Sequence, residues 1–114
     1  MNVREATAEE APTVESILNA AMLEVPEEGT QYVACEGERI LGSLVLIENE
    51  IDAIAVRPGR RGQGVGRALV AHVAGECETI FAHFDPKVRP FYEKLGFDIE
   101  EGVDGRLCGT RNSD

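Results

Sequence analysis

The residues of this chain with the clearest chemical potential form a run of glycines and arginines, V-R-P-G-R-R-G-Q-G-V-G-R, at positions 56–67. Four of the chain's eleven Lys and Arg residues lie in this run, and none of its acids does. Gly62, Gly64 and Gly66 lack a Cβ atom, so the backbone can turn sharply and approach a ligand closely. A helix that begins in such a loop presents unpaired N–H groups and the positive end of its dipole. The run therefore predicts an anion site, and a phosphate is its simplest ligand.

The spacing of the glycines excludes two common phosphate motifs. A P-loop requires Gly-Lys-Ser/Thr at its end, whereas Gly64 is followed by Val65 and Gly66. The dinucleotide fingerprint G-x-G-x-x-G fails because Arg67 stands where the third glycine belongs. The pattern that fits is R-x-x-G-x-G, which begins at Arg61, directly after the apolar stretch 51–56 and at the start of a helical stretch.

This pattern resembles the acetyl-CoA signature of the GCN5-related N-acetyltransferases. A second segment supports the resemblance, because P-F-Y-E-K-L-G-F at residues 90–97 is similar to that family's short helix, which carries a tyrosine and is closed by Gly-Phe. The two motifs occur in the family's order and at a plausible distance. The resemblance covers nearly the whole chain, with its specific residues in 51–70 and 85–97.

The family resemblance implies an α/β (α+β) fold with the order β-α-β-β-β-α-β-α-β-β, one N-terminal helix fewer than usual. The sheet would be mixed, mostly antiparallel and twisted, with helices on both faces, and residues 1–114 would form a single domain. A capping-box pattern, Thr7 to Glu10, predicts the first helix, whose apolar stripe runs from Val14 to Met22. Later elements are expected at 31–36, 40–48, 51–56, 65–76, 79–84, 85–96, 97–101 and 106–110, with frayed residues at 112–114.

Composition narrows the classes of partner. The formal net charge of −10 argues against nucleic acid, whose phosphates need a basic face. No apolar run approaches a membrane span, and the N-terminus has no signal pattern, so we expect no membrane association and a cytoplasmic location. Three dispersed cysteines are expected to be reduced, and the isolated His72 and His83 predict no metal site. The acidic composition, with two lysines against nine arginines, suggests a halophilic source or steering of a cationic substrate.

The resemblance also assigns donor-binding roles to individual residues. The loop amides of 62–67 would hold the pyrophosphate of acetyl-CoA, the main chain of 54–56 would bind its pantetheine arm, and Arg61 and Arg67 would add charge. Tyr92 corresponds to the tyrosine that protonates the departing sulfur, with core packing beside Phe91 and Phe97 as the alternative. Asp85 replaces an asparagine that many relatives use on the cofactor, so it either binds the cofactor or caps its helix. The candidate cofactor-binding residues are Ile54, Ala55, Val56, Arg61, Gly62, Gln63, Gly64, Val65, Gly66, Arg67, Asp85 and Tyr92.

The proton acceptor for the amine has weaker support in the sequence. Asp52 lies on the cofactor strand where relatives often carry an acid that reaches the acceptor, and Glu48 and Glu50 flank it. Tyr92 and Asp52 are therefore the catalytic candidates, and a mechanism without a dedicated base stays open.

The function expected from the resemblance is acetyl-CoA-dependent N-acetyl transfer to a primary amine, directly within a ternary complex, since neither motif contains a cysteine. The acceptor would be a small amine or a protein or peptide N-terminus, and no metal is expected. The short segment 26–30 leaves the acceptor site open or completed by a second subunit of a homodimer. The alternatives are a non-catalytic acyl-CoA-binding or regulatory module and a nucleotide-binding module.

Overall fold

Apolar residues recur at strand or helix spacing along most of the chain, and the elements they form build one layered sheet. The computed structural model describes residues 1–112. The strands are hydrogen-bonded in the order β1-β2-β3-β4-β5-β7-β6, and every pair except β4–β5 is antiparallel. The predicted order of elements and the mixed, mostly antiparallel sheet are thereby confirmed. The strands are β1 (Asn2–Glu5), β2 (Thr30–Glu36), β3 (Arg39–Ile47), β4 (Glu50–Val56), β5 (Thr79–Phe84), β6 (Asp98–Glu101) and β7 (Leu107–Asn112).

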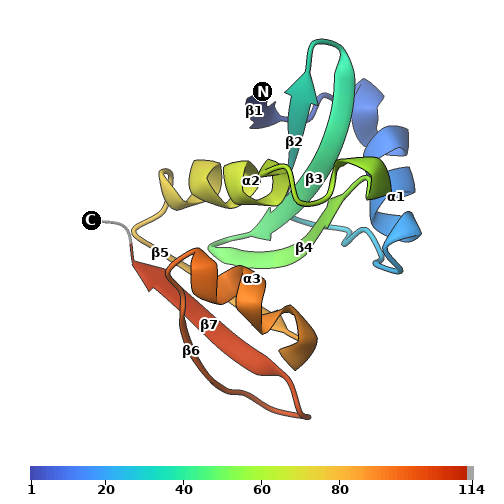
Figure 1. Cartoon of the computed structure of the whole chain (residues 1–114). Helices are drawn as coiled ribbons and strands as arrows, with labels where there is room; N and C mark the ends of the chain where they lie inside the picture. The colour runs from blue at the N-terminus through green and yellow to red at the C-terminus, as the bar shows by residue number, and fades with distance from the viewer. Residues whose placement is uncertain (113–114) are drawn as a thin grey trace.

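Helices cover both faces of the sheet, as Figure 1 shows. On one face, α1 buries Val14, Ile17 and Leu18 against β2, β3 and β4. On the other face, α2 buries Leu69 and Val73 in a second core that continues through β5 to α3. None of the helices in residues 1–112 is long and apolar enough to cross a membrane. The helices are α1 (Ala11–Ala20), α2 (Val65–Ala74) and α3 (Arg89–Lys94), with 3-10 turns η1 (Ala8–Glu10), η2 (Pro58–Arg60) and η3 (Pro86–Val88).

The first helix ends earlier than its predicted stripe. Met22 was expected on the buried face, yet it is 95% exposed and has a φ of 63°. The chain leaves α1 through a Schellman turn, in which Leu23 N–H donates to the Leu18 carbonyl and Met22 N–H to the Asn19 carbonyl, both at 2.9 Å. Met22 takes the left-handed position at which most helices have glycine, and Leu23 turns back toward the protein.

Several other predicted boundaries also shift by one or two residues. The helix predicted to reach residue 76 ends at Ala74, and the strand predicted to reach Glu48 ends at Ile47, because Glu48 adopts a φ of 56° in the following turn. The last strand runs on to Asn112, whose side-chain oxygen accepts a 2.8 Å hydrogen bond from the Thr79 hydroxyl. The prediction of fraying is therefore wrong for Asn112, and its other two residues, 113 and 114, lie outside the described residues.

Candidate functional site

The sheet opens along its middle. Strands β4 and β5 are parallel neighbours, but only two residue pairs join them, Glu50 with Phe81 and Ile51 with Ala82. Beyond Ile51, β4 continues to Val56 without a ladder partner on this side, and Figure 1 shows the two halves of the sheet diverging there. Main-chain N–H and C=O groups along this edge are therefore available to a ligand that runs beside the strand.

A β-bulge marks the point where the strands separate. Against β3, Val45 pairs with Ala53 while Leu46 pairs with Ile51, which leaves Asp52 as an extra residue on β4. A bulge changes the direction in which the main-chain groups and the side chain of the extra residue point. Asp52 is accordingly exposed, although the rest of β4 is buried or half-buried.

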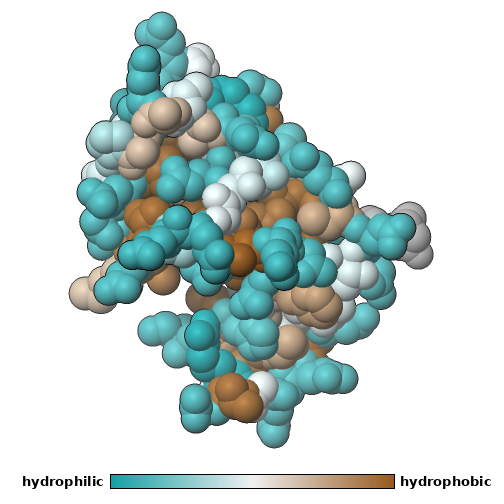
Figure 2. Space-filling view, turned by 180° about the vertical axis from the view of Figure 1, so that it is seen from behind, coloured by the Kyte–Doolittle hydropathy of each residue, from teal (hydrophilic) through white to brown (hydrophobic). Residues whose placement is uncertain are grey.

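A cavity of about 720 Å³ occupies the opening between the strands. It is lined on the α2 and α3 face by the glycine loop, Phe91 and Tyr92, and on the α1 face by Ala21, Leu23 and His83. Figure 2 shows a notch between the two halves of the molecule with apolar side chains at its base. The cavity thus passes through the sheet, so two molecules could meet in it from opposite faces.

The glycine loop takes the conformation its composition predicts. Gly62 and Gly64 have φ values of 79° and 84°, and a Cβ atom at either would meet no other atom within 4 Å. Gly64 is the N-cap of α2, and the first helical hydrogen bond runs from the Ala68 N–H to the Gly64 carbonyl at 3.0 Å. The N–H groups of the first turn, residues 65–67, have no acceptor within the helix, and these residues line the cavity, so this helix end is suited to bind an anion.

Gly66 serves a different purpose from the other two. A Cβ atom there would lie 3.1 Å from the Phe91 ring, so its absence allows α3 to pack against the start of α2. The two sequence motifs are thus in direct contact, because the glycine of the first accommodates the aromatic ring of the second.

The arginines divide between anchoring and exposed roles. The Arg57 side chain donates through Nε to the Ile40 carbonyl at 2.6 Å, and Arg60 lies 3.3 Å from the Glu36 carboxylate. Both contacts fasten the loop to the β2–β3 hairpin. Arg61 and Arg67 are exposed and line the cavity beside Arg60, and unlike Arg57 and Arg60 they have no such contact with the hairpin, so they can contact an anion.

Tyr92 is packed on three sides and lines the cavity. Its ring stacks on Phe84 at a centroid distance of 4.1 Å and meets Phe91 and Phe97 edge-on, at 5.1 and 5.2 Å. Only 5% of the residue is exposed, and this burial raises the pKa of Tyr92 to about 12, partly offset by the nearby positive charge of Arg106. Tyr92 therefore packs in the core, as the alternative prediction stated, and also lines the cavity, as a catalytic role requires.

Asp85 performs the capping role that the sequence left open. Its carboxylate accepts a 2.9 Å hydrogen bond from Lys87 N–H at the start of η3. Asp85 also lines the cavity, and one of its oxygens stays available there.

The structure brings nearly all of the predicted site residues together. Ile54, Ala55 and Val56 line the cavity along the free edge of β4, and Asp52 lines it at the bulge. Gln63 is the exception, because it is exposed on the loop outside the lining. Within residues 1–112 no three His, Cys, Asp or Glu side chains are grouped in a way that could hold a metal ion.

Sequence reasoning missed an acid–histidine pair at the α1 side of the cavity. His83 of β5 lines the cavity, and its Nδ1 lies 3.2 Å from the Glu50 carboxylate of β4. The two residues are 33 positions apart, and only the parallel β4–β5 pairing brings them together, so no local motif could have revealed them.

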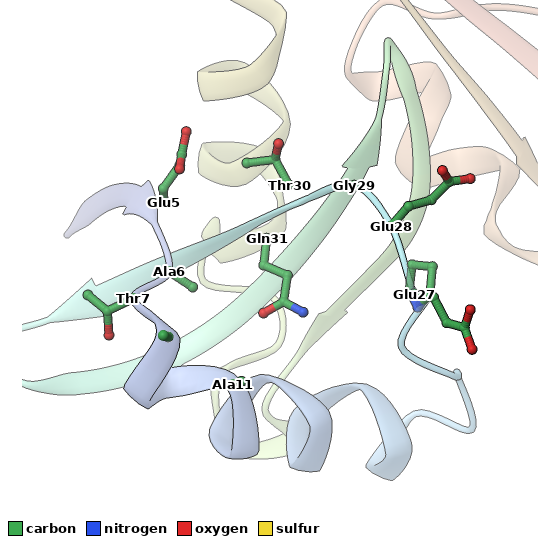
Figure 3. A pocket seen from close by; sticks show the side chains of 11 residues that line it. Glu5, Ala6, Thr7, Ala11, Glu27, Glu28, Gly29, Thr30 and Gln31 are labelled. Carbon is green, nitrogen blue, oxygen red and sulfur yellow. The ribbon is translucent and has the colours of Figure 1, made fainter.

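A second, smaller hollow of about 310 Å³ lies between the start of α1 and the segment that leads into β2. Its rim carries Glu5, Glu27 and Glu28, whose carboxylates point in different directions in Figure 3. Negative charge without convergent donors does not suit a phosphate, so the larger cavity is the candidate site.

Comparisons with known proteins show which family and fold the chain resembles. Residues 27–99 match the family model described as an acetyltransferase (GNAT) domain. The peptidyl-lysine N-acetyltransferase YjaB of Escherichia coli is 32% identical over 78 residues, which cover 66% of this chain and 53% of that protein. Its Salmonella typhimurium counterpart is 28% identical over the same length and is covered to 54%. The chain therefore spans about half the length of these curated relatives.

Solved structures show the same fold over the full chain. The ribosomal-protein-S18-alanine N-acetyltransferase of Escherichia coli superposes with a TM-score of 0.77 at 18% identity, covering 99% of this chain and 94% of that one. Rv2747 of Mycobacterium tuberculosis, in complex with CoA and NLQ, superposes with a TM-score of 0.80 at 16% identity, covering 98% and 99%. At these identities the likeness establishes the fold.

Proposed function

The chain belongs to the acetyltransferase (GNAT) family, as its two motifs predicted, and on this premise we propose that it transfers the acetyl group of acetyl-CoA to a primary amine. The observation that carries the proposal is the cavity through the sheet. One opening has anion-binding amides and a free strand edge, and the other opening has carboxylates and an imidazole. A phosphorylated donor and a cationic acceptor suit these two openings.

The residues on the donor side fit the parts of acetyl-CoA. The amides of the first turn of α2, with Arg61 and Arg67, would hold the pyrophosphate. The edge of β4 from Asp52 to Val56 would pair with the amides of the pantetheine arm. A main-chain N–H at the bulge would face the thioester oxygen, where a hydrogen bond that tightens as charge develops is worth several kcal/mol.

Tyr92 is suited to the departing sulfur. With its pKa raised to about 12, its hydroxyl keeps its proton throughout the range in which enzymes of this kind work. A thiol of the cysteine type titrates near pH 8.5, well below this tyrosine, so the thiolate does not fully deprotonate the hydroxyl. Tyr92 would therefore stabilise the thiolate by donating a short hydrogen bond, and final protonation would draw on solvent.

The acceptor that we propose to test first is a lysine side chain in a peptide. The support is the peptidyl-lysine N-acetyltransferase activity for which the two relatives are named and the acidic charge of this chain, which attracts cationic groups. Small amines and peptide N-termini should be tested beside it, since both also present a primary amine nitrogen.

The experiment that tests the proposal measures thiol release from acetyl-CoA with this amine panel, together with acetyl-CoA affinity by calorimetry, for wild type and Tyr92→Phe. We expect turnover in the wild type, a fall in kcat of at least about tenfold in the variant, and an affinity unchanged within about twofold. Tight binding without turnover on any amine would favour the non-catalytic acyl-CoA-binding module instead. Absence of acetyl-CoA binding would refute the donor site itself.

A further inference from the structure

His83 lies on the face of the sheet from which an acceptor would enter. Along β5, Ile80, Ala82 and Phe84 pack into the core under α2 and α3. Successive strand residues alternate between faces, so His83 points to the opposite face, the one that α1 covers. The cavity reaches that face at Ala21 and Leu23, directly after α1. His83 is thus across the sheet from the glycine loop and from Tyr92.

Glu50 gives the His83 ring a defined orientation. The Glu50 carboxylate is 3.2 Å from Nδ1, and the two side chains are 45% and 41% exposed, so the pair is open to an incoming molecule. In the neutral ring, Nδ1–H donates to the carboxylate and Nε2 is left with its lone pair free to accept a proton. A carboxylate in this place also stabilises the imidazolium formed afterwards.

Asp52 lines the same cavity but has different chemistry. Its carboxylate has no hydrogen bond or ion pair to another described residue, and it is exposed at the bulge. An ionised carboxylate beside an amine stabilises the ammonium form, which raises the pKa of the amine and opposes its deprotonation. A neutral imidazole attracts the ammonium group less strongly and can accept its proton.

We infer that His83, oriented by Glu50, is the base that takes the proton of the acceptor amine, while Asp52 draws the ammonium group into the cavity. The inference rests on the acetyl transfer proposed above. It differs from the expectation drawn from the sequence, which gave Asp52 as the candidate base, left a mechanism without a base open, and assigned no role to His83.

The proton balance assigns each group one step. His83 Nε2 takes one proton from the ammonium nitrogen, and the lone pair this frees forms the C–N bond to the acetyl carbon. The electron pair of the broken C–S bond stays on sulfur, which leaves as a thiolate hydrogen-bonded to Tyr92. The nitrogen loses a second proton to solvent as the amide forms, the thiolate takes one proton from solvent, and His83 releases its proton to solvent, so that one proton is set free overall.

The charged and titratable groups around His83 come from several elements. Glu50 and Asp52 face it from β4, and Asp85 and Lys87 line the cavity after β5. Cys108 is its cross-strand neighbour on β7, with Glu100 beyond on β6. Arg106 donates to the His83 carbonyl at 2.7 Å, and Tyr92 lines the cavity from the other face. Any of these groups could alter the pH dependence of kcat/KM. A change is therefore attributed to His83 only after comparison with matched variants.

The chain contains a matched control. His72 of α2 lies 3.1 Å from Glu76, with exposures of 35% and 50%, and it does not line the cavity. The experiment compares His83→Gln, His72→Gln, Glu50→Gln and Asp52→Asn for kcat/KM with a lysine peptide between pH 6 and 9.5. Acetyl-CoA affinity and the thermal unfolding midpoint are measured for each variant.

We expect the wild-type profile to rise and then level off above neutral pH, as it does with a neutral imidazole base. In His83→Gln only free amine reacts, so kcat/KM falls about 100-fold at pH 7 and then rises about tenfold per pH unit toward the titration of lysine near 10.4. Glu50→Gln loses about tenfold with a profile of wild-type shape, Asp52→Asn mainly raises KM, and His72→Gln stays within about twofold.

Three outcomes would overturn the assignment. His83→Gln matching His72→Gln at every pH would remove His83 from the mechanism while acetyl transfer stands. A profile that changes shape in Asp52→Asn and not in His83→Gln would move the base to Asp52. A wild type that binds acetyl-CoA yet acetylates no amine would overturn the proposed function, and this assignment would fall with it.

Discussion

The two openings of the cavity present different kinds of chemical group to a ligand. On the donor side, the contacts offered to a ligand are main-chain groups, namely the first-turn amides of α2 and the free edge of β4. On the α1 side they are side chains, the carboxylate of Asp52 and the ring of His83, which Glu50 contacts from outside the lining. A backbone site depends on conformation, and conformation constrains residue type, so it leaves a sequence pattern. A side-chain site depends on which residues the topology brings together.

This difference suggests where each side can vary. In the proposed reaction the donor is the same molecule for every acceptor, and main-chain binding tolerates changes in neighbouring side chains. The acceptor side has few fixed requirements beyond a base and room for the amine, so a small number of substitutions there can alter specificity. The predictions that follow separate the two sides.

The largest expected effect is a loss of folding stability at alkaline pH, caused by the buried tyrosines. Measuring it in tyrosine variants distinguishes the packing role of Tyr92 from its proposed role on the donor side. Burial raises the pKa of both Tyr92 and Tyr32 to about 12 from about 10. Between pH 10 and 12 the unfolded chain therefore binds fewer protons than the folded one, and the free energy of unfolding falls with rising pH. Each tyrosine accounts for up to roughly 2–3 kcal/mol of that loss.

Replacing either tyrosine by phenylalanine should flatten this decline, measured as urea unfolding at pH 9, 10 and 11. Only Tyr92→Phe should also lower kcat, because Tyr32 packs near His72 of α2 and does not line the cavity. If Tyr32→Phe reduced kcat equally, the loss in Tyr92→Phe would reflect general loosening of the core.

An effect on donor affinity is expected for Gly64→Ala, with Gly37→Ala as its control. Both glycines have positive φ, 84° and 63°, and neither has an atom within 4 Å of a built Cβ. Alanine in this region costs about 1–2 kcal/mol, so both variants should lose several degrees of thermal stability.

Only Gly64→Ala distorts the amides of α2, so it alone should lose affinity for acetyl-CoA, by about tenfold in calorimetry. The KM for the amine should be unchanged in both variants. Equal acetyl-CoA affinities for the two would show that the loop conformation does not hold the donor.

The smallest effect is expected for Asp85→Asn. Asparagine keeps the oxygen that accepts from Lys87 N–H and adds two donors that can face the donor molecule. We expect acetyl-CoA to bind up to about threefold more tightly, with unchanged kcat. Asp85→Ala provides the control, because it removes the cap and should lower stability without the gain in affinity.

The features that could be predicted from the sequence are those with a local physical cause. The turns at Gly62 and Gly64 could be predicted because few other residues accept a positive φ. Gly96 closes α3 at a φ of 83° for the same reason. The order of strands and helices followed from apolar spacing and from the family resemblance. Their ends were less predictable, and at Met22 the chain uses an exposed methionine in a position that usually requires glycine.

The features that could not be predicted depend on tertiary contacts. The His83–Glu50 pair needs the parallel β4–β5 register, which forms only after α2 has crossed the sheet. Gly66 was expected to admit a ligand, but its missing side chain makes room for Phe91, a packing relation between two distant segments. Neither contact can be recognised from a pattern within ten or fifteen consecutive residues.

The sheet order has a consequence for how the protein behaves at high concentration. Unpaired strand edges are templates for aggregation, and within residues 1–112 they include the outer edges of β1 and β6 and the inner edge of β4. The outer strands are four residues long, and β6 carries Asp98, Glu100 and Glu101, whose like charges repel a second copy. The edge of β4 lines the cavity, so it is recessed between the two halves of the sheet. A ligand seated in the cavity would therefore also cover the long unpaired edge of β4 and shield it from a second polypeptide.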